Sequence, residues 1–274
     1  MDTLTADFSI LWPAMIAGAL VALTHVPLGQ QVLSRGIVFI DLAIAQVAGL
    51  GVIAAHSFGF ELSGWVTQAS AVSAALLGGL LLTWTERRRP EVQEALIGIL
   101  FVLASTAQIL ILANDPHGGE DLKDLLAGQI LWVSTEQLTR SAILTAIILI
   151  VWFGFRERLG RVGFYVLFAF MVTMSVQLVG VYLVFTSLIV PAIATYRYRK
   201  SRQLTIGYAL AIVSYVLGLA LSAVNDLPSS PVIVWAMALV ALLVHAVGKD
   251  ERGDGMIRQG HSELDDRLRD VRPK

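Results

Sequence analysis

Two polar side chains interrupt an apolar run at residues 39–52, FIDLAIAQVAGLGV. Asp41 brings a carboxylate and Gln46 an amide into a stretch that otherwise suits a membrane interior. An ionised side chain at membrane depth costs several kcal/mol unless it faces water or a partner, and such residues often mark ion pathways. Oxygen atoms of both groups could bind a passing cation. The run therefore predicts either a polar pathway or a buried polar contact.

The spacing of these two residues decides whether they act as a pair. Side chains five residues apart on a helix diverge by about 140° and are separated by about 7.5 Å of rise. We predict that Gln46 faces a translocation path and that Asp41 lies nearer its inner mouth. The alternatives are an interhelical hydrogen bond for Gln46, and for Asp41 a contact with interfacial water or with the loop at Arg35. Gln108 and Gln177 are further path candidates, with helix packing as their alternative.

The polar stretch NDPHGGEDLKD at residues 114–124 gathers possible metal ligands. His117, Glu120 and Asp121 carry imidazole and carboxylate groups, which suit divalent metals. They predict a site that captures a cation near a pore mouth. An ordinary solvated loop and a docking surface for a soluble binding protein are the alternatives.

The composition places these groups in a membrane protein. Of 274 residues, 56% are hydrophobic and 15% are charged, and the mean hydropathy is +0.71. Soluble domains are about 45–50% apolar and about 25% charged. A single buried core could not absorb this excess, so lipid must solvate much of the chain. The acidic start MDTLTADFSILWP lacks the basic region of a signal peptide, and we expect the first apolar segment to remain as a span.

The apolar segments predict an all-α, polytopic membrane helix bundle with about nine transmembrane helices, or eight if one short segment is re-entrant. They lie at 8–27, 36–57, 64–85, 93–113, 138–155, 163–178, 180–196, 204–224 and 230–248. Gly180 is the predicted break within 163–196, and His25 beside Pro27 is predicted to end the first span at the interface. Residues 121–137 look amphipathic. We expect a permease domain at 1–248 and a polar, disordered cytoplasmic tail at 249–274.

Basic residues predict the orientation. One choice of sides places nearly all of them in cytoplasmic loops, as the positive-inside rule requires. These are Arg35; Arg87, Arg88 and Arg89; Arg156, Arg158 and Arg161; Arg197, Arg199, Lys200 and Arg202; and those from Lys249 onward. Lys123 and Arg140 remain on the other side. The N-terminus is then outside and the C-terminus in the cytoplasm.

Missing motifs exclude several classes of protein. The chain has no cysteine, which excludes disulfides and thiolate metal sites. It has no phosphate-binding GxxxxGK[ST] loop, no HExxH pair and no GxSxG elbow. We therefore expect a transporter or channel subunit that is not itself an enzyme and has no nucleic-acid partner.

Four ordered stretches resemble the permease subunits of ABC transporters for zinc and manganese. They are LSRGIVFIDLAIAQVAGLGV at 33–52, EALIGILFVLAS at 94–105, DLLAGQILWVS at 124–134 and LVGVYLVFTSLIVPAIAT at 178–195. DLPSSPVIV at 226–234 resembles the family's turn into its last helix, and the likeness covers residues 15–248. The first stretch departs from the family, because Gln46 stands at the histidine position and Leu42 at the aspartate position.

The resemblance implies a homodimeric permease in the bacterial inner membrane that imports zinc or manganese by alternating access. It implies a separate ABC ATPase that binds ATP, an extracytoplasmic solute-binding protein and no cofactor within this chain beyond the transported metal. It also implies that Pro191, Arg197, Arg199 and Lys200 belong to a coupling segment on the ATPase, whereas the charges alone equally fit a positive-inside loop. Pro191 lies inside an apolar run, and we expect it to break the helix there and favour a turn.

Three other functions stay open. The same machine could carry a metal chelate or another small solute, which loss of the family histidine would allow. A secondary transporter or channel would need no ATPase. A membrane-embedded enzyme is the third, and the missing catalytic motifs argue against it.

Overall fold

The chain folds into helices throughout the part that the structure describes. This computed structural model describes residues 2–61, 64–113, 115, 118–128, 130–155 and 158–248, with residues 2–10 and 121 described by their backbone alone. The elements are α1 (Asp2–Arg35), α2 (Ile40–Ser57), α3 (Trp65–Arg88), η1 (Pro90–Val92), α4 (Gln93–Leu112), α5 (Gly118–Ala127), η2 (Ile130–Trp132), α6 (Thr135–Phe155), α7 (Gly160–Val179), α8 (Val181–Ala194), α9 (Lys200–Asn225) and α10 (Ser229–Val247).

The helix lengths confirm a polytopic membrane bundle. Within the described residues, eight helices are long and apolar enough to cross a bilayer, and α8 is a ninth, shorter apolar helix of 14 residues. Helices satisfy their own backbone hydrogen bonds, which is what a lipid environment demands of a spanning segment. The predicted count of eight to nine spans therefore holds. The tail at 249–274 lies outside the described residues.

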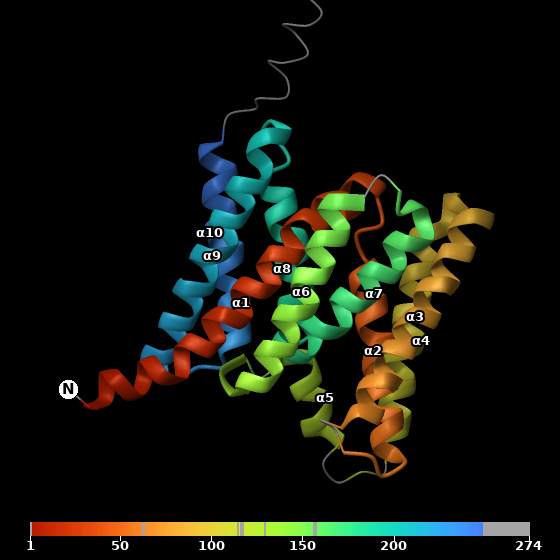
Figure 1. Cartoon of the computed structure of the whole chain (residues 1–274), viewed down its shortest axis with the longest axis horizontal. Helices are drawn as coiled ribbons and strands as arrows, with labels where there is room; N and C mark the ends of the chain where they lie inside the picture. The colour runs from red at the N-terminus through yellow and green to blue at the C-terminus, as the bar shows by residue number, and fades with distance from the viewer. Residues whose placement is uncertain are drawn as a thin grey trace, which may run out of the picture.

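The helices form two flanks around a central group (Figure 1). α2 packs against α3 and α4 on one flank, and α9 packs against α10 on the other. Between the flanks, α1 packs against α6, α8 and α9, and α3 reaches α7. The short helix α5 lies toward the lower end of the bundle in Figure 1 and packs against α4, α7 and α8.

The first helix is longer than its sequence predicted. Pro27 lies inside α1, which continues to Arg35, so the predicted end near residue 27 is wrong. His25 is fully buried rather than interfacial, and its Nδ1 lies 2.9 Å from the backbone oxygen of Val21. Gly29 explains the continuation in part, because a methyl group there would overlap the backbone of Leu188 on α8. The close packing of α1 on α8 holds the helix together past the proline.

Gly180 breaks the long apolar stretch as predicted. Its φ of 82° is readily adopted only by glycine, and it separates α7 from α8. Gly128, at the end of α5, packs directly against it, so that a side chain on either glycine would overlap the other backbone. Ser230 adds a hydrogen bond from its Oγ to the backbone oxygen of Val179, at 3.2 Å. These contacts fix α5 against the interior of the bundle.

Several of the basic helix ends meet at one end of the bundle. The guanidinium of Arg35, at the end of α1, lies 4.1 Å from the ring centroid of Phe164 near the start of α7. Arg161 lies 3.8 Å from a carboxylate oxygen of Glu86 near the end of α3. The end of α1, the end of α3 and the start of α7 therefore lie at the same end of the bundle, where the sequence places three of the basic loops together.

Candidate translocation site

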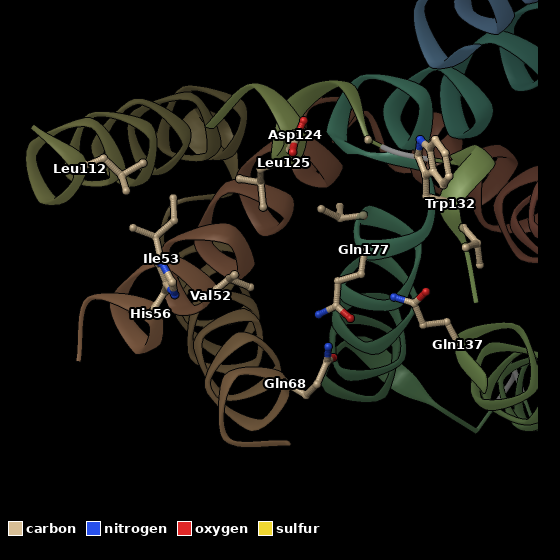
Figure 2. Close-up of a pocket in the computed structure, with 13 residues that line it drawn as sticks. Val52, Ile53, His56, Gln68, Leu112, Asp124, Leu125, Trp132, Gln137 and Gln177 are labelled. Atoms are coloured by element: carbon tan, nitrogen blue, oxygen red, sulfur yellow. The ribbon is translucent and has the colours of Figure 1, made fainter. Parts of the chain in front are cut away.

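The end of the bundle that holds α5 contains a cavity of about 370 Å³. The ends of α2, α3, α6 and α7 form its walls together with α5 and η2. Gln68, Gln137 and Gln177, which we call the glutamine cluster, place their amide groups in it from three different helices (Figure 2). His56 and Asp124 line the same cavity on the side of α2 and α5 (Figure 2).

Local hydrogen bonds determine which donors and acceptors of the glutamine cluster remain available to a ligand. The backbone N–H of Ser134 donates to Oε1 of Gln137 at 2.9 Å, and the backbone N–H of Gln137 donates to Ser134 Oγ at 3.2 Å. This capping box at the start of α6 occupies the amide oxygen of Gln137 and leaves its NH₂ group. Gln68 and Gln177 have no hydrogen-bond partner among the described residues, so both their oxygens and their NH₂ groups face the cavity.

His56 is held in one orientation at the cavity wall. Its Nδ1 lies 3.2 Å from the backbone oxygen of Phe60, which can only accept. Nδ1 is therefore the donor in this contact, and in the neutral ring this tautomer leaves the lone pair on Nε2. A hydrogen bond of this kind is typical of histidines that bind metals through Nε2.

Leu125 closes the floor of the cavity. A methyl group on Gly49 would lie 2.6 Å from Cδ2 of Leu125 and 3.4 Å from Oε1 of Gln108. The bare backbone of Gly49 thus lets the leucine side chain settle on α2 beside the amide of Gln108. Leu125 belongs to the lining of the cavity, whereas Gln46 and Gln108 do not.

Gln46 and Gln108 form a buried pair beneath Leu125. Nε2 of Gln108 donates to both the backbone oxygen and Oε1 of Gln46, each at 2.8 Å. Gln46 therefore makes the interhelical hydrogen bond considered for it, between α2 and α4. Oε1 of Gln108 is buried and has no hydrogen-bond partner among the described residues. The pair therefore leaves one buried oxygen, Oε1 of Gln108, free to accept a hydrogen bond or to contact a cation.

Asp41 lies nearer the other end of α2 and is fully buried. Neither carboxylate oxygen has a hydrogen-bond partner in the described part of the chain. The contact with Arg35 considered for it is not formed there, because the Arg35 guanidinium lies over the ring of Phe164. The structure thus separates Asp41 from Gln46, as their spacing predicts, and leaves the place of both on a path as a prediction.

The four predicted path residues occupy three levels of the bundle. Gln177 lies in the cavity, Gln46 and Gln108 meet below Leu125, and Asp41 stands alone further along α2. Sequence reasoning missed the two other members of the glutamine cluster and His56. For Gln137 a signal existed, since Ser134 three residues before it spells a capping box.

The predicted metal site at residues 117–121 is only partly described. His117 lies outside the described residues, as does the side chain of Asp121, and Glu120 is exposed near the start of α5. Among the described residues, no three His, Asp or Glu side chains lie close enough to hold a metal ion together. The site stays a prediction.

The predicted coupling segment lies at the other end of the bundle. Pro191 was expected to break its helix, but it is buried inside α8, which continues to Ala194. The helix ends at Thr195, whose Oγ1 donates to the backbone oxygen of Pro191 at 2.7 Å. Pro191 has no N–H to donate to the backbone oxygen one turn earlier, and α8 ends within one turn after it.

A turn at residues 195–199 leads directly into α9, with no separate helix between. Arg197, Arg199 and Lys200 are exposed on it. A separate cavity of about 240 Å³ opens beside this turn and is lined by Lys200 and Tyr196. The structure thus presents a basic, hollowed surface, and its contact with an ATPase stays a prediction.

Comparison with known proteins decides the family. The profile of the ABC 3 transport family matches residues 7–164 and 154–248, nearly the whole described chain. The chain belongs to the ABC 3 transport family. It is a multi-pass membrane permease of the metal ABC importer family, as the ordered motifs of its sequence indicated.

Proteins with zinc and manganese in their names match along most of this chain. The high-affinity zinc uptake system membrane protein ZnuB of Haemophilus influenzae is 23% identical over 257 residues, covering 86% of this chain and 97% of that protein. The manganese transport system membrane protein MntC of Halalkalibacterium halodurans is 23% identical over 258 residues, covering 86% and 87%.

The fold is also found in a solved structure. A chain of PsaBC from Streptococcus pneumoniae, solved in complex with Fab, superposes with a TM-score of 0.72 at 20% sequence identity. The match covers 89% of this chain and 93% of that one. At this identity the likeness establishes the helix arrangement alone.

Proposed function

We propose that this chain is the permease subunit of an ATP-driven importer for a divalent transition metal, zinc or manganese. Its family membership and relatives named for zinc uptake and manganese transport support this proposal. The proposal goes further than the family, because it assigns the substrate and places the path within this chain.

The buried oxygens of Gln108 and Asp41 carry the proposal. Both side chains are fully buried, and Oε1 of Gln108 and both carboxylate oxygens of Asp41 lack hydrogen-bond partners among the described residues. Unpaired acceptors at membrane depth are costly, and ionisable residues placed there usually serve ion pathways. Oxygen acceptors without donors suit a passing cation, which satisfies each of them in turn.

The path that we propose runs from the cavity at α5 toward the basic end of the bundle. A cation enters beside Gln177, passes Leu125 when that side chain moves, meets the Gln46–Gln108 pair and then reaches Asp41. A neutral amide holds a cation weakly, which favours release over trapping. Leu125 is then a gate, and alternating access consists of opening it while the inner end is closed.

The proposal includes separate partners. ATP is bound and hydrolysed on an ABC ATPase, which contacts residues 192–203, and this chain holds no resident cofactor. A solute-binding protein delivers the metal at the cavity end, and a second copy of the chain completes the permease as a homodimer. The protein lies in the bacterial inner membrane with its N-terminus outside and its C-terminus in the cytoplasm, as the basic residues predict.

Cellular metal content tests the proposal. Cells that carry the transporter genes, with and without this chain, are grown in limiting zinc or manganese, and their metals are measured by mass spectrometry. Loss of the chain should lower one of these metals severalfold. Asp41→Asn should also lower the content of that metal. Asp226→Asn is the control and should not lower it, because Asp226 is exposed after α9 and asparagine tolerates the left-handed backbone at this position. Unchanged zinc and manganese without the chain would refute the proposed substrate.

A further inference from the structure

A second cavity adjoins the first at the glutamine cluster. It has a volume of about 240 Å³ and lies between α3, α6 and α7. All three members of the cluster line both cavities, so the two spaces meet at these amide groups. The polar groups beyond the cluster differ between the two sides, and this difference indicates what could bind.

The second cavity offers hydrogen-bond donors. Thr173 is 2% exposed, and its Oγ1 has no partner among the described residues. Ser141, on α6, is also buried and lines the same space without a side-chain partner in the described part of the chain. Gln137 adds its NH₂ group, because its oxygen is occupied by the capping box. The NH₂ group of Gln137 can only donate, and the hydroxyls of Thr173 and Ser141 in the wall of the cavity can also donate, so the lining favours a ligand with acceptor oxygens.

Arg140 supplies a positive charge at this cavity. Its guanidinium pairs with Glu136 one turn earlier on α6, and both side chains are largely exposed. One such pair leaves several of the five guanidinium N–H donors for a ligand. Among the described residues, the lining contains no carboxylate and no imidazole. Glu136 offsets part of the guanidinium charge, and the N–H donors that remain on Arg140 favour an acceptor such as a carboxylate over a bare metal cation.

The first cavity has the opposite character. His56 and Asp124 line it together with the glutamine cluster (Figure 2), whereas Arg140 lines only the second cavity. Imidazole and carboxylate suit a divalent metal. The joined cavities thus present a cation side and an anion side, with neutral amides between them that accept and donate hydrogen bonds.

We propose that the joined cavities bind the divalent metal as a complex with a small carboxylate chelator. The metal lies on the side of His56 and Asp124, and free carboxylate oxygens of the chelator lie on the side of Arg140, Ser141 and Thr173. This inference rests on the proposed function and deepens it, because it states the chemical form in which the metal enters. The phosphate of a lipid headgroup has similar acceptor oxygens and is the other possible occupant of the anion side.

Binding to the full-length chain in maltoside detergent tests the inference. The probes are manganese with equimolar citrate, citrate alone, manganese alone, inorganic phosphate and short-chain phosphatidylglycerol, measured by titration calorimetry. Manganese citrate should bind at least tenfold more tightly than citrate or manganese alone. Equal affinity for manganese alone would refute the inference, and so would competition by phosphate or phosphatidylglycerol at concentrations similar to citrate.

Substitutions on the anion side sharpen the test. Arg140→Met should weaken manganese citrate binding about tenfold, since a charged hydrogen bond is lost, and Thr173→Val should weaken it severalfold. Glu136→Gln should tighten it, because it frees the guanidinium from its partner. Lys123→Met, an exposed cation on α5 that does not line either cavity, is the matched control and should leave affinity unchanged. Unchanged affinity in Arg140→Met and Glu136→Gln together would refute the site.

Uptake by cells separates this inference from the proposed function. In cells that carry the whole transporter, Arg140→Met should reduce the uptake of manganese supplied with citrate. It should reduce the uptake of manganese supplied alone by less. If the variant takes up both forms like the unmodified chain, the chelate site is refuted and metal import stands. If the unmodified transporter takes up neither manganese nor zinc in any form, the proposed function itself fails.

Discussion

One nitrogen of Gln108 holds two oxygens of Gln46 at membrane depth. Nε2 of Gln108 donates to the backbone oxygen and to Oε1 of Gln46, at 2.8 Å in both cases. Only one of these two acceptors belongs to the Gln46 side chain. The contact between α2 and α4 therefore does not depend on the amide of Gln46 alone, and its structural and transport roles can be separated by substitution.

Gln46→Leu should reduce transport more than stability. The variant loses the side-chain acceptor but keeps the bond to the backbone oxygen, so the cost in stability is about 0.5–2 kcal/mol. A cation that passes between Leu125 and Asp41 would lose one oxygen ligand in this variant. If that ligand stabilises the passing cation by about 1.4 kcal/mol, its loss lowers the transport rate about tenfold. Uptake of manganese per folded molecule, with folding followed by size-exclusion chromatography, measures this.

A buried amide elsewhere serves as the control for Gln46. Gln93 is 4% exposed, and its Nε2 donates to the backbone oxygen of Leu82 at 3.0 Å, away from the proposed path. Gln93→Leu should lower stability without lowering uptake per folded molecule. Gln46→His should tighten zinc binding, because zinc favours nitrogen ligands. Normal uptake in Gln46→Leu would mean that the amide only joins two helices.

Leu125→Ala should open the floor of the cavity. The leucine side chain lines the cavity and lies on Gly49 beside Oε1 of Gln108, which is outside the cavity lining, and we propose that it closes the cavity there. Since the chain has no cysteine, a single Gln108→Cys substitution reports access to this position. Reaction of that cysteine with a membrane-impermeant thiol reagent should be at least severalfold faster when Leu125 is also alanine.

Leu126→Ala, the neighbouring partly buried leucine, is the matched control for this experiment. It does not line the cavity and should leave the reaction rate unchanged. Equal rates with leucine or alanine at position 125 would show that another side chain closes the cavity floor.

Hydropathy predicted the bundle well because lipid selects for long apolar helices. The break at Gly180 was also predictable, since glycine interrupts an apolar stretch that is too long for one span. Pro27 and Pro191 misled the prediction of helix ends. In a packed membrane bundle, neighbouring helices stabilise a helix past a proline, and this support depends on tertiary contacts such as that of Gly29 with α8.

The candidate site was less predictable than the fold. Gln46 and Gln108 were recognisable as amides within apolar spans, but their pairing depends on how α2 and α4 align. Gln68 and Gln137 lie in the first turns of their helices, where polar residues are ordinary. Only the arrangement of α3, α6 and α7 in space brings them to Gln177, and no local pattern encodes that arrangement.

Gly29→Ala should destabilise the bundle. Its new methyl group would overlap the backbone oxygen of Leu188, which cannot move without shifting α8. Overpacking of this kind costs about 1–3 kcal/mol. Thermal unfolding in detergent should show a lower midpoint than for the unmodified chain. Gly98→Ala is the matched control, because nothing lies within 4 Å of the added methyl group on α4. A midpoint for Gly29→Ala equal to that of Gly98→Ala would contradict the close packing of α1 on α8.

Charge reversal at the turn between α8 and α9 should uncouple ATP hydrolysis from transport. Arg197 and Arg199 are exposed beside the cavity at Lys200, while the turn itself is held by backbone bonds such as Gln203 N–H to the Arg199 oxygen, at 3.1 Å. Arg197→Glu with Arg199→Glu therefore changes the charge of the surface more than its shape. In vesicles that contain permease, ATPase and binding protein, manganese uptake per ATP hydrolysed should fall severalfold while the permease stays in the membrane. Arg158→Glu, an exposed arginine in the loop between α6 and α7, is the control and should preserve the ratio. If the double variant keeps both uptake and stimulated hydrolysis, the turn only anchors the topology and the ATPase docks elsewhere.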